Sequence, residues 1–556
     1  MKALHQVGRG QGPTAADSAR ISALQRPATL DALEQGLFDC VVIGGGIAGA
    51  GIACESAQRG LRTALVELDD FASGTSSRST KLIHGGLRYL ALGEFAHVRE
   101  TARERKTVRH LAPHLAQPCW AVLPARSRAA LTLLRLAVMT YEHLGQVASE
   151  DRHRIWNSDE LERHEPVLDR QRYPFACAYR EYLTDDARLV LANLRAAVRA
   201  GALVINHALV DRIANRFDAH EVGVSCRLSG RRLTLRSRAL INASGPWLEH
   251  LRVLEDPGAR PVLQWSRGIH VVMPAELLPV QNVLVLRSSD ARYLFAVRRA
   301  GIVYLGTTDT ATQARPVHWP EIGSDELHYL LREVSAYCGR QAPALGSCVW
   351  AWAGLRALVA QPGRRSQDVS RRDELLVGAH GMVSVAGGKL TGYRMIAKRA
   401  LDEAGKVVGG AWPKAPRKIA PLPGGAFDGD VGPLSATLGA SFKLARECAE
   451  RLSMLYGSEA VDVVKLDQRP LGDDGIVLRG EVDWAVLHEG GATLLDVVYR
   501  RLRLPLYKPN AVTSLLEPIA SRMSDLLGWT EQRAREQVGQ VEARMQQDLA
   551  ALQPRL

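Results

Sequence analysis

Three glycines with the spacing GxGxxG follow an apolar run at residues 38–43. In this pattern Gly44 permits a tight turn, Gly46 lets the backbone approach a pyrophosphate, and Gly49 lets the next helix pack close to the strand. The N-terminal amides of that helix point toward an anion. The spacing therefore predicts a dinucleotide site whose pyrophosphate contacts are Gly44, Gly46, Ile47, Ala48 and Gly49.

A second apolar run ends at Glu67, which lies 18 residues after Gly49. A carboxylate at this position can accept hydrogen bonds from an adenosine ribose. Strand, glycines, helix and acidic residue together predict a βαβ unit that binds a dinucleotide. NAD and FAD share this unit, so the following segment has to distinguish them.

The hydroxyl-rich segment at residues 73–89 favours FAD. Its polar side chains can donate hydrogen bonds to a pyrophosphate, and its pair of glycines lets the chain pass close to a flat ring. A solvated Ser/Thr loop is the alternative. The predicted contacts are Ser76, Ser77 and Lys81 with the pyrophosphate, and Gly85 and Gly86 with the ring.

Two later segments also combine an apolar run with glycines. Residues 240–247 run from a strand into small residues and a Gly-Pro turn, which suits backbone beside the adenine end of FAD. Residues 383–394 run from strand to glycines to helix, and amides at that helix start can lie near the flavin pyrimidine ring, where reduced flavin is negatively charged. An ordinary strand exit and a structural loop are the alternatives. The predicted contacts are Ala243, Gly245, Gly388, Lys389, Leu390 and Thr391.

These motifs resemble those of the FAD-dependent glycerol-3-phosphate dehydrogenases, the respiratory type that passes electrons to quinone. The string KLIHGGLRYL at residues 81–90 is the most specific match, and the likeness covers roughly residues 22–545. The resemblance implies bound FAD and oxidation of sn-glycerol 3-phosphate to dihydroxyacetone phosphate, with hydride transfer from C2 to flavin N5 and electrons passed to a membrane quinone. It also implies that Val210 touches adenine through its backbone. Further matching strings are Leu183–Asn193, Asn242–Trp247, Gly306–Asp309, Gly387–Arg394 and Glu481–Arg501.

The resemblance further implies a clamp for the substrate phosphate and a base for its C2 hydroxyl. Arginine suits the clamp because its planar fork pairs with phosphate oxygens. His270 is favoured as the base, since imidazole titrates near neutral pH, and His84 competes for that role or supports the flavin. A lone histidine in an apolar strand is otherwise more often a core residue. The implied clamp residues are Arg88, Tyr89, Arg356, Arg371 and Lys389, and Arg372 can take the register of Arg371.

Two residues depart from the family's pattern. Ala357 stands where the family has proline after the clamp arginine, and Gly392 stands where it has a second threonine in the GGKLTTYR string. Both can loosen the pocket. They put the substrate in question more than the flavin chemistry.

The elements that position these residues must form more than one domain, because 556 residues exceed the usual size of one core. Apolar runs alternate with helical stretches, which predicts an α/β fold: a doubly wound, Rossmann-like FAD-binding domain, a mixed α/β substrate domain and a mostly helical C-terminal domain. A cluster of prolines and glycines at residues 413–425 marks the last boundary. The expected ranges are 1–36 for a tail and short helix, 37–105, 180–248 and 357–410 for the FAD-binding domain, 106–179 and 249–356 for the substrate domain, and 420–556 for the C-terminal domain.

The net charge of +12 indicates an anionic partner, without choosing among phosphate, acidic lipid and nucleic acid. Residues 124–144 combine apolar side chains with Arg126, Arg128 and Arg135, and they predict a helix lying on an anionic membrane surface. Packing on the protein's own core is the alternative. Eight cysteines without a CxxC pair fit a reducing cytosol. The expected location is cytoplasmic, peripheral on the inner face of the cell membrane.

Other functions and partners were weighed against this hypothesis. An oxygen-using glycerol-3-phosphate oxidase, or a related flavin oxidase of a small hydroxy or amino substrate, is the alternative enzyme. Nucleic acid is not expected as a partner, since no zinc-finger, helix-turn-helix or RNP signature occurs. A metal is not expected either, because Pro113 interrupts the helical spacing of His110 and His114. A homodimer stays an open alternative.

Overall fold

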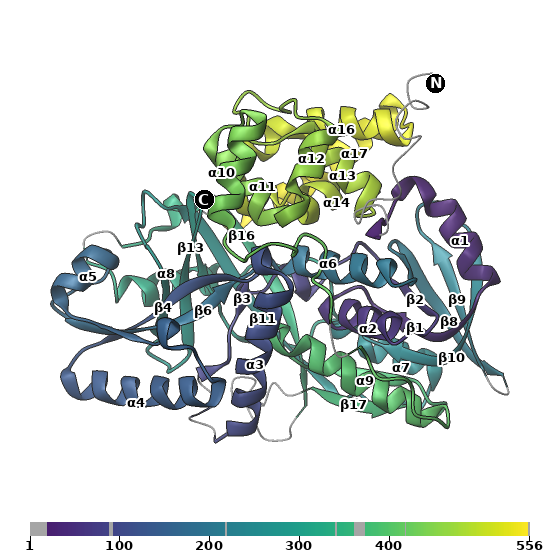
Figure 1. Cartoon of the computed structure of the whole chain (residues 1–556), viewed down its shortest axis with the longest axis horizontal. Helices are drawn as coiled ribbons and strands as arrows, with labels where there is room; N and C mark the ends of the chain where they lie inside the picture. Colours follow the sequence, from purple (N-terminus) through teal and green to yellow (C-terminus); the bar gives the residue numbers. More distant parts are fainter. Residues whose placement is uncertain are drawn as a thin grey trace.

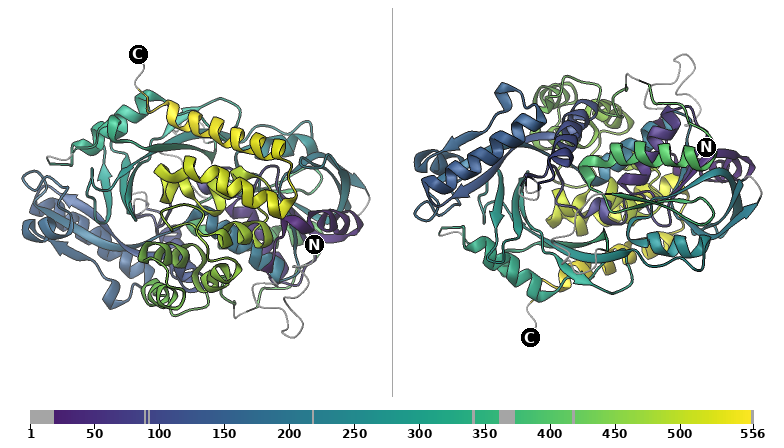
Figure 2. Two further views of the ribbon diagram at one scale, coloured as in Figure 1. Left: turned by 90° about the horizontal axis from the view of Figure 1, so that it is seen from above. Right: turned by 90° about the horizontal axis from the view of Figure 1, so that it is seen from below.

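The computed structural model describes residues 19–87, 90, 93–216, 219–339, 342–360, 373–416 and 419–553. Over these residues the chain forms two β-sheets and a group of C-terminal helices (Figure 1). Seen from above in Figure 2, these helices lie over the junction between the parts that hold the two sheets. The predicted fold class is confirmed.

The first sheet carries the glycine turn at its centre. Its middle strand β1 (Leu37–Ile43) runs parallel to both of its neighbours, β10 (Arg232–Asn242) and β2 (Thr63–Val66). The strand order is β17-β18-β10-β1-β2-β7. The remaining strands are β7 (Leu203–Ile205), β17 (Glu374–Val377), β18 (Val383–Ala386) and the hairpin of β8 (Ala208–Arg216) and β9 (Ala219–Cys226).

Both faces of this sheet are covered, as is usual for parallel strands. Cys40 and Val42 of β1 share a core with helices on one face, and Val41 and Ile43 share a core with elements on the other. The first group of helices is α2 (Ile47–Gln58), α6 (Asp186–Arg199) and α9 (Tyr393–Val407). The second face is covered by α1 (Arg26–Gln35), α7 (Leu248–Glu255) and the β8–β9 hairpin.

The second sheet is mostly antiparallel and follows the order β15-β11-β14-β13-β12-β4-β6-β3, with β16 paired to β11 and β5 paired to β6. Helices α3 (Phe95–Leu111) and α4 (Arg128–Gly145) lie beside it (Figure 1). Its strands are β3 (Leu82–Ile83), β4 (Gln117–Ala125), β5 (Arg154–Trp156), β6 (Phe175–Leu183), β11 (Leu263–Pro274), β12 (Val283–Arg287), β13 (Tyr293–Arg299), β14 (Ile302–Gly306), β15 (Thr310–Thr312) and β16 (Trp350–Val359).

Alternation along β11 decides where His270 points. Ile269, Val271 and Met273 are buried in a core shared with α5 (Ser158–His164) and α8 (Ser324–Ser335). Successive side chains of a strand point to opposite faces, so His270 and Val272 point away from that core. Val272 packs instead with the C-terminal helices.

The C-terminal region is helical, as predicted. Apart from two isolated bridges, Pro470 with Leu478 and Glu489 with Ile21, its described residues from 419 onward form helices and loops. The helices are α10 (Val431–Phe442), α11 (Arg446–Tyr456), α12 (Ala460–Leu466), α13 (Arg479–His488), α14 (Leu494–Asp496), a π-helix at Val497–Arg501, α15 (Leu504–Tyr507), α16 (Val512–Leu527) and α17 (Glu531–Ala550).

Strand β6 of the second sheet continues to Leu183, past the boundary expected at residue 179, and strands depart from the expected domain ranges in two further places. Strand β3 lies inside the range expected for the FAD-binding domain, yet it pairs with β6 of the second sheet. Strand β16 continues to Val359, past the boundary expected at residue 356. In each case strand pairing, which joins residues distant in sequence, places the boundary.

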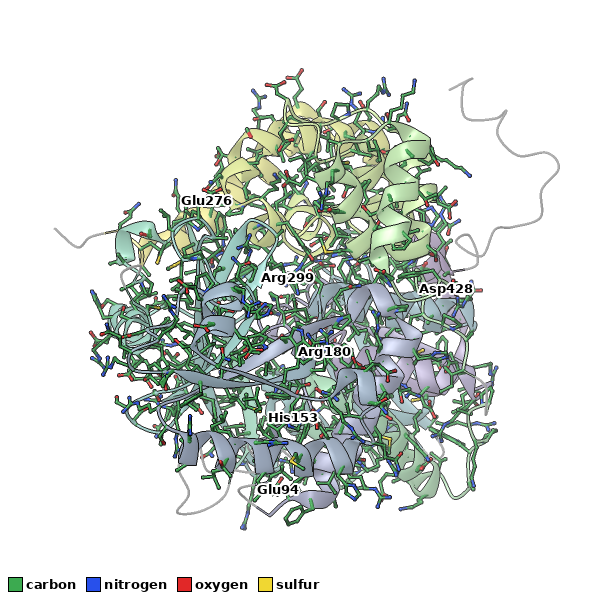
Figure 3. The ribbon with its side chains drawn as sticks, turned by 60° about the vertical axis from the view of Figure 1, so that its left-hand side comes forward. Glu94, His153, Arg180, Glu276, Arg299 and Asp428 are labelled. Carbon is green, nitrogen blue, oxygen red and sulfur yellow. The ribbon has the colours of Figure 1, made fainter. Side chains whose placement is uncertain are left out.

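Buried arginine contacts join the C-terminal helices to α6, which covers the first sheet, and to the second sheet. Arg188 of α6 forms a bidentate pair with Glu489, at 2.6 and 2.7 Å, and both side chains are buried. Arg299 at the end of β13, labelled in Figure 3, donates a hydrogen bond of 2.8 Å to the Tyr507 hydroxyl. The helical domain is therefore bound to the sheets through charges that water does not reach.

We predict that Glu489→Gln strongly destabilises the protein, because it leaves the Arg188 guanidinium buried without its carboxylate. The loss should be about 3 to 5 kcal/mol of unfolding free energy, as for other broken buried pairs. Urea unfolding followed by circular dichroism measures it. The matched control is Glu450→Gln, which removes the exposed pair with Arg446 and should not move the midpoint. Equal midpoints for both variants would contradict the prediction.

Candidate active site

The glycine turn allows α2 to pack directly against the ends of β1 and β10. Gly44 has φ +113°, a left-handed value that favours glycine. A Cβ on Gly49 would lie 1.8 Å from the Gly44 carbonyl oxygen, and a Cβ on Gly44 would lie 2.6 Å from the Ala243 carbonyl oxygen. Since neither side chain has room, the first turn of α2 rests directly on the backbone that leaves β1 and β10. This is the crevice where doubly wound sheets bind ligands.

The N-terminus of α2 faces Ser76. Gly46 is the N-cap and carries no side chain, and the Ile47 amide donates a 2.9 Å hydrogen bond to Ser76 Oγ. Ser77 lies next along the chain, with its hydroxyl 3.5 Å from the Gly74 carbonyl. Two of the predicted donors are thus at or beside the helix end that favours an anion.

Glu67 joins the end of β2 to the glycine turn. Its carboxylate accepts hydrogen bonds from the Gly45 amide at 2.6 Å and the Asp69 amide at 2.9 Å, and burial raises its pKa to about 7. Its carbonyl accepts from the Ala208 amide at 2.7 Å, which brings β8 and its buried Val210 to this end of the site. The adenosine contacts of Glu67 and Val210 stay predictions.

The two segments predicted to meet the flavin ring lie together. The His84 amide donates to Thr391 Oγ1 at 3.2 Å, and the Thr391 hydroxyl donates to the His84 carbonyl at 3.0 Å. Gly388 has φ +95° and Gly245 has φ +57°, so both use conformations that favour glycine. Leu390 then opens a short 3₁₀ helix that leads into α9.

Lys81 and Gly85 have partners that their predicted roles did not include. The Lys81 ammonium lies 3.0 Å from both oxygens of the buried Asp186 and donates to the Ser77 carbonyl at 2.8 Å. It therefore points to α6, and we correct its expected direction toward the pyrophosphate. A Cβ on Gly85 would lie 2.3 Å from the Tyr141 hydroxyl. That close approach requires a glycine at position 85. At position 86 a glycine is favoured because φ is +73°.

His270 and Arg356 lie on one face of paired strands. In the register of β11 with β16, His270 is opposite Trp352, Gly268 opposite Gly354, and Ser266 opposite Arg356. The two glycines between them let other groups pack close to this face, and a Cβ on Gly354 would lie 2.9 Å from Arg78 Cβ. A Cβ on Gly268 would lie 2.2 Å from an Arg356 terminal nitrogen, so the guanidinium lies over Gly268 toward His270.

Arg356 is held by hydroxyl and carbonyl groups of the loop after β14. One terminal nitrogen donates to Thr307 Oγ1 at 2.7 Å, and the other donates to the Thr308 carbonyl at 3.0 Å. Asp309 is 3.6 Å away and balances part of the charge. These contacts orient the guanidinium as a clamp would require.

His270 is packed between the loop at residues 73–81, here called the cofactor loop, and the Trp352 indole. Its Nε2 lies 3.0 Å from Thr80 Oγ1, and its ring stacks on Trp352 with centroids 4.9 Å apart and planes at 13°. Burial, together with the charges of Lys81 and Arg356, lowers the pKa of His270 well below its usual value of 6.5. The imidazole is therefore neutral at working pH and able to accept a proton.

Three residues of the site had no predicted role: Thr80, Thr307 and Trp352. Thr307 could have been found from the sequence, because it belongs to the matched string Gly306–Asp309. The contacts of Thr80 and Trp352 depend on how distant segments pack. Arg88, Tyr89 and Arg371 lie outside the described residues. Lys389 is described, beside Leu390, and its clamp role stays a prediction.

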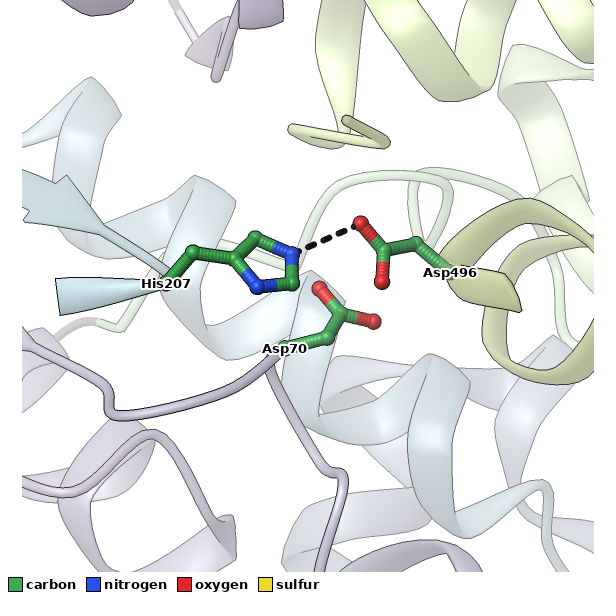
Figure 4. Close-up of side chains that lie close together, drawn as sticks. All are labelled: Asp70, His207 and Asp496. Atoms are coloured by element: carbon green, nitrogen blue, oxygen red, sulfur yellow. Dashed lines mark hydrogen bonds and ion pairs between the residues drawn. The ribbon is translucent and has the colours of Figure 1, made fainter. Parts of the chain in front are cut away.

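A cluster of Asp70, His207 and Asp496 has the residue types of a metal site (Figure 4). Arg501 and Arg500 bind the Asp70 carboxylate, and Arg500 also binds Asp496 at 3.0 Å. His207 Nε2 lies 2.9 Å from Asp496 Oδ2. Because guanidinium groups already occupy these oxygens, we interpret the cluster as an ion-pair network between the first sheet and the C-terminal helices.

The residues present fit a dinucleotide cofactor. A cradle without side chains, an open helix N-terminus and a buried carboxylate meet at the carboxyl ends of β1 and β2. From there the cofactor loop leads to the face that holds His270 and Arg356.

Comparison with known proteins agrees with this description. Residues 39–394 match the family described as FAD dependent oxidoreductase, and residues 418–534 match the C-terminal domain of alpha-glycerophosphate oxidase. The aerobic glycerol-3-phosphate dehydrogenase of Bacillus subtilis is 30% identical over 92% of this chain and 95% of its own length. The enzyme of that name from Staphylococcus saprophyticus is 32% identical over 92% and 94%.

Solved structures show the same fold. The glycerol-3-phosphate dehydrogenase of Bacillus halodurans, complexed with FAD, has a TM-score of 0.78 at 28% identity and covers 96% of this chain and all of its own. The L-alpha-glycerophosphate oxidase of Mycoplasma pneumoniae has a TM-score of 0.51 at 16% identity over 69% of this chain and 97% of its own. That second likeness concerns the fold alone. The cofactor of the chain is FAD.

We predict that Gly49→Ala abolishes FAD retention, because its Cβ would collide with the Gly44 carbonyl and displace α2. The flavin absorbance of the purified protein measures this, with acid release showing that the wild-type FAD is noncovalent. Gly539→Ala in α17 is the matched control, since no atom lies within 4 Å of the added Cβ. Full FAD content in Gly49→Ala would overturn the role of the turn.

Proposed function

Because the chain belongs to the family of FAD-dependent glycerol-3-phosphate dehydrogenases, we propose that it oxidises sn-glycerol 3-phosphate to dihydroxyacetone phosphate. The observation that carries the proposal is the shared face of β11 and β16, where an oriented guanidinium extends over Gly268 toward a neutral buried imidazole. A phosphorylated alcohol needs both groups: a clamp for the dianion and a base for the hydroxyl.

The glycine turn, Ser76 and Glu67 would hold the adenosine and pyrophosphate, and the segments around His84 and Thr391 would hold the ring. Bound FAD supplies the two-electron acceptor, at N5, for the hydride that leaves C2. The protein's contribution is to orient C2 and to remove the hydroxyl proton.

His270 is the proposed base. If Nε2–H donates to Thr80 Oγ1, the lone pair of Nδ1 is available, and this atom has no hydrogen-bond partner among the described residues. The Nδ1 atom can then take the C2 hydroxyl proton as the hydride leaves. His84 fits this role less well, because its backbone joins the two ring-binding segments through Thr391.

Arg356 is the proposed phosphate clamp. Its guanidinium has five N–H donors, so it can bind phosphate oxygens while keeping contacts with Thr307 and Thr308. Lys389 is proposed to assist it. Roles for Arg88, Tyr89 and Arg371, which lie outside the described residues, are carried by the family resemblance alone.

We further propose a membrane quinone as the electron acceptor. An oxygen-using glycerol-3-phosphate oxidase is the second candidate, and the match of residues 418–534 to an oxidase domain favours it. Aerobic turnover distinguishes them. A quinone-linked enzyme reduces a soluble quinone analogue without releasing hydrogen peroxide in proportion to substrate, whereas an oxidase releases one peroxide per substrate oxidised.

We predict that glycerol 3-phosphate bleaches the flavin band under anaerobic conditions and that His270→Asn slows this bleaching by about 10² to 10⁴ fold, the usual size of a general-base effect. Stopped-flow absorbance measures the rate, with FAD content as the control. Because the pKa of His270 is lowered, kcat/KM of the wild type should stay level as pH falls to about 6.5. No bleaching would refute the substrate, and bleaching at the normal rate in His270→Asn would refute only the base.

The surface of α4 supports peripheral contact with an anionic membrane. Its inward face buries Val138 and Tyr141, while Leu133 is 70%, Leu136 61% and Met139 47% exposed. Exposed apolar side chains in one stripe, beside the exposed Arg128 and Arg135, fit an interfacial helix better than one that packs on its own core. In Figure 1 this helix forms the lower edge of the molecule. No described helix is long and apolar enough to cross a bilayer.

We predict that the wild type floats with vesicles containing anionic lipid at low salt, and that changing both Leu133 and Leu136 to Glu abolishes flotation. The matched control is Leu466→Glu, which adds a charge to an exposed leucine of α12 on the upper side of Figure 1. A wild type that stays in the soluble fraction would refute membrane contact. Equal flotation of wild type and both variants would exclude α4 as the contact.

A further inference from the structure

A cavity lies where the second sheet, the cofactor loop and the C-terminal helices meet. Its empty space is about 470 Å³, which includes open solvent. Its apolar walls are Trp319, Trp350, Trp352 and Tyr499, and its charged lining consists of Arg78, Lys81, Arg500, Arg503 and Asp548. Four cations thus face one carboxylate.

Arg78 differs from the other cations of this cavity. Lys81, Arg500 and Arg503 each have a carboxylate partner. Arg78 is 7% exposed, and no described carboxylate forms an ion pair with it. Its contacts are long hydrogen bonds to the Ser73 and Ala353 carbonyls, at 3.3 to 3.4 Å. Burial lowers its pKa to about 9, so the group remains charged at neutral pH. Asp548 acts on this charge from beyond ion-pair distance. A buried cation without a direct ion pair is costly, and an anion in the cavity would reduce that cost.

The aromatic walls add a second requirement. The Arg78 guanidinium lies 3.7 Å from the centroid of the Trp319 ring, and Trp350 and Trp352 are neighbours on one face of β16. Indole faces bind flat apolar groups well. The cavity therefore offers an anion contact beside aromatic surface.

We propose that this cavity binds a small organic anion with a flat apolar part, whose anionic group pairs with Arg78. The cavity adjoins the proposed cofactor and substrate sites, since Ser77 and Trp352 line it. Ser76 points to the α2 N-terminus, whereas Arg78 and Lys81, from the same loop, line the cavity. Trp352 is shared, since it lines the cavity and stacks on His270. A bound anion would therefore touch the indole that supports the proposed base.

Titration calorimetry on the FAD-loaded full chain tests the site with four probes. The binding probes are 1-naphthyl phosphate and 1-naphthoate, which share an aromatic ring and an anionic oxygen group. The controls are 1-naphthol, which lacks the charge, and inorganic phosphate, which lacks the ring. At least one naphthyl anion should bind, with each control at least about tenfold weaker. The anion that binds more tightly identifies the group that the site prefers.

Three variants locate the binding. Arg78→Gln should lower the affinity for the naphthyl anion by about 10- to 100-fold, the usual effect of losing a charged hydrogen bond. Arg356→Lys alters the proposed substrate clamp and Arg446→Gln removes an exposed arginine; both should leave the affinity unchanged. If Arg78→Gln fails to retain FAD, Arg78→Lys replaces it, with an intermediate loss expected.

Several outcomes would overturn the proposal. They are no binding of either naphthyl anion, equal binding of 1-naphthol, or unchanged affinity in the Arg78 variant. Affinity lost in Arg356→Lys but kept in Arg78→Gln would place the probe in the substrate site. Since the measurement is binding and not turnover, it stands apart from the test of the proposed reaction.

Discussion

One buried carboxylate, Asp186, holds together the three parts of the molecule that meet at the site. Its Oδ2 accepts hydrogen bonds from the amide and hydroxyl of Ser79, at 3.0 and 2.7 Å, while Lys81 and Arg503 bind Oδ1 at 3.0 Å. Asp186 begins α6, where the helix dipole favours a negative charge. A carboxylate can be buried only when such partners surround it. The cofactor loop, α6 and the C-terminal helices must therefore come together for any of them to be stable in place.

This constraint extends to the proposed base. Thr80 lies between the two residues that Asp186 binds, so its hydroxyl is held against His270. The Lys81 ammonium, held by Asp186, is one of the charges that lower the pKa of His270. The same ion pair thus fixes a hydrogen-bond partner of the imidazole and adds to the lowering of its pKa, which is caused first by burial.

The C-terminal helices form ion pairs with residues that lie beside the site. Arg503 pairs with Asp185 and Asp186, Arg501 pairs with Asp70, and Glu489 pairs with Arg188. Asp70 follows β2 closely, after Glu67, so the network reaches the adenosine end of the cofactor site as well as the loop near His270. A helical domain far from the glycine turn in the sequence can in this way set the geometry of the adenosine end of the cofactor site and of the loop near His270.

The sequence by itself determined the features that depend only on residues close together in the chain. The turn between β1 and α2 follows from glycines that tolerate positive φ and close packing, and the C-terminal helices follow from their periodicity; both predictions hold in the structure. The resemblance also named His270 and Arg356. Only the tertiary structure decided that the Arg356 guanidinium lies over Gly268 toward His270, because this depends on the register of β11 with β16. It also turned Lys81 toward Asp186, since a buried ammonium takes the carboxylate that folding brings to it, and local spacing carries no information about a partner 105 residues away.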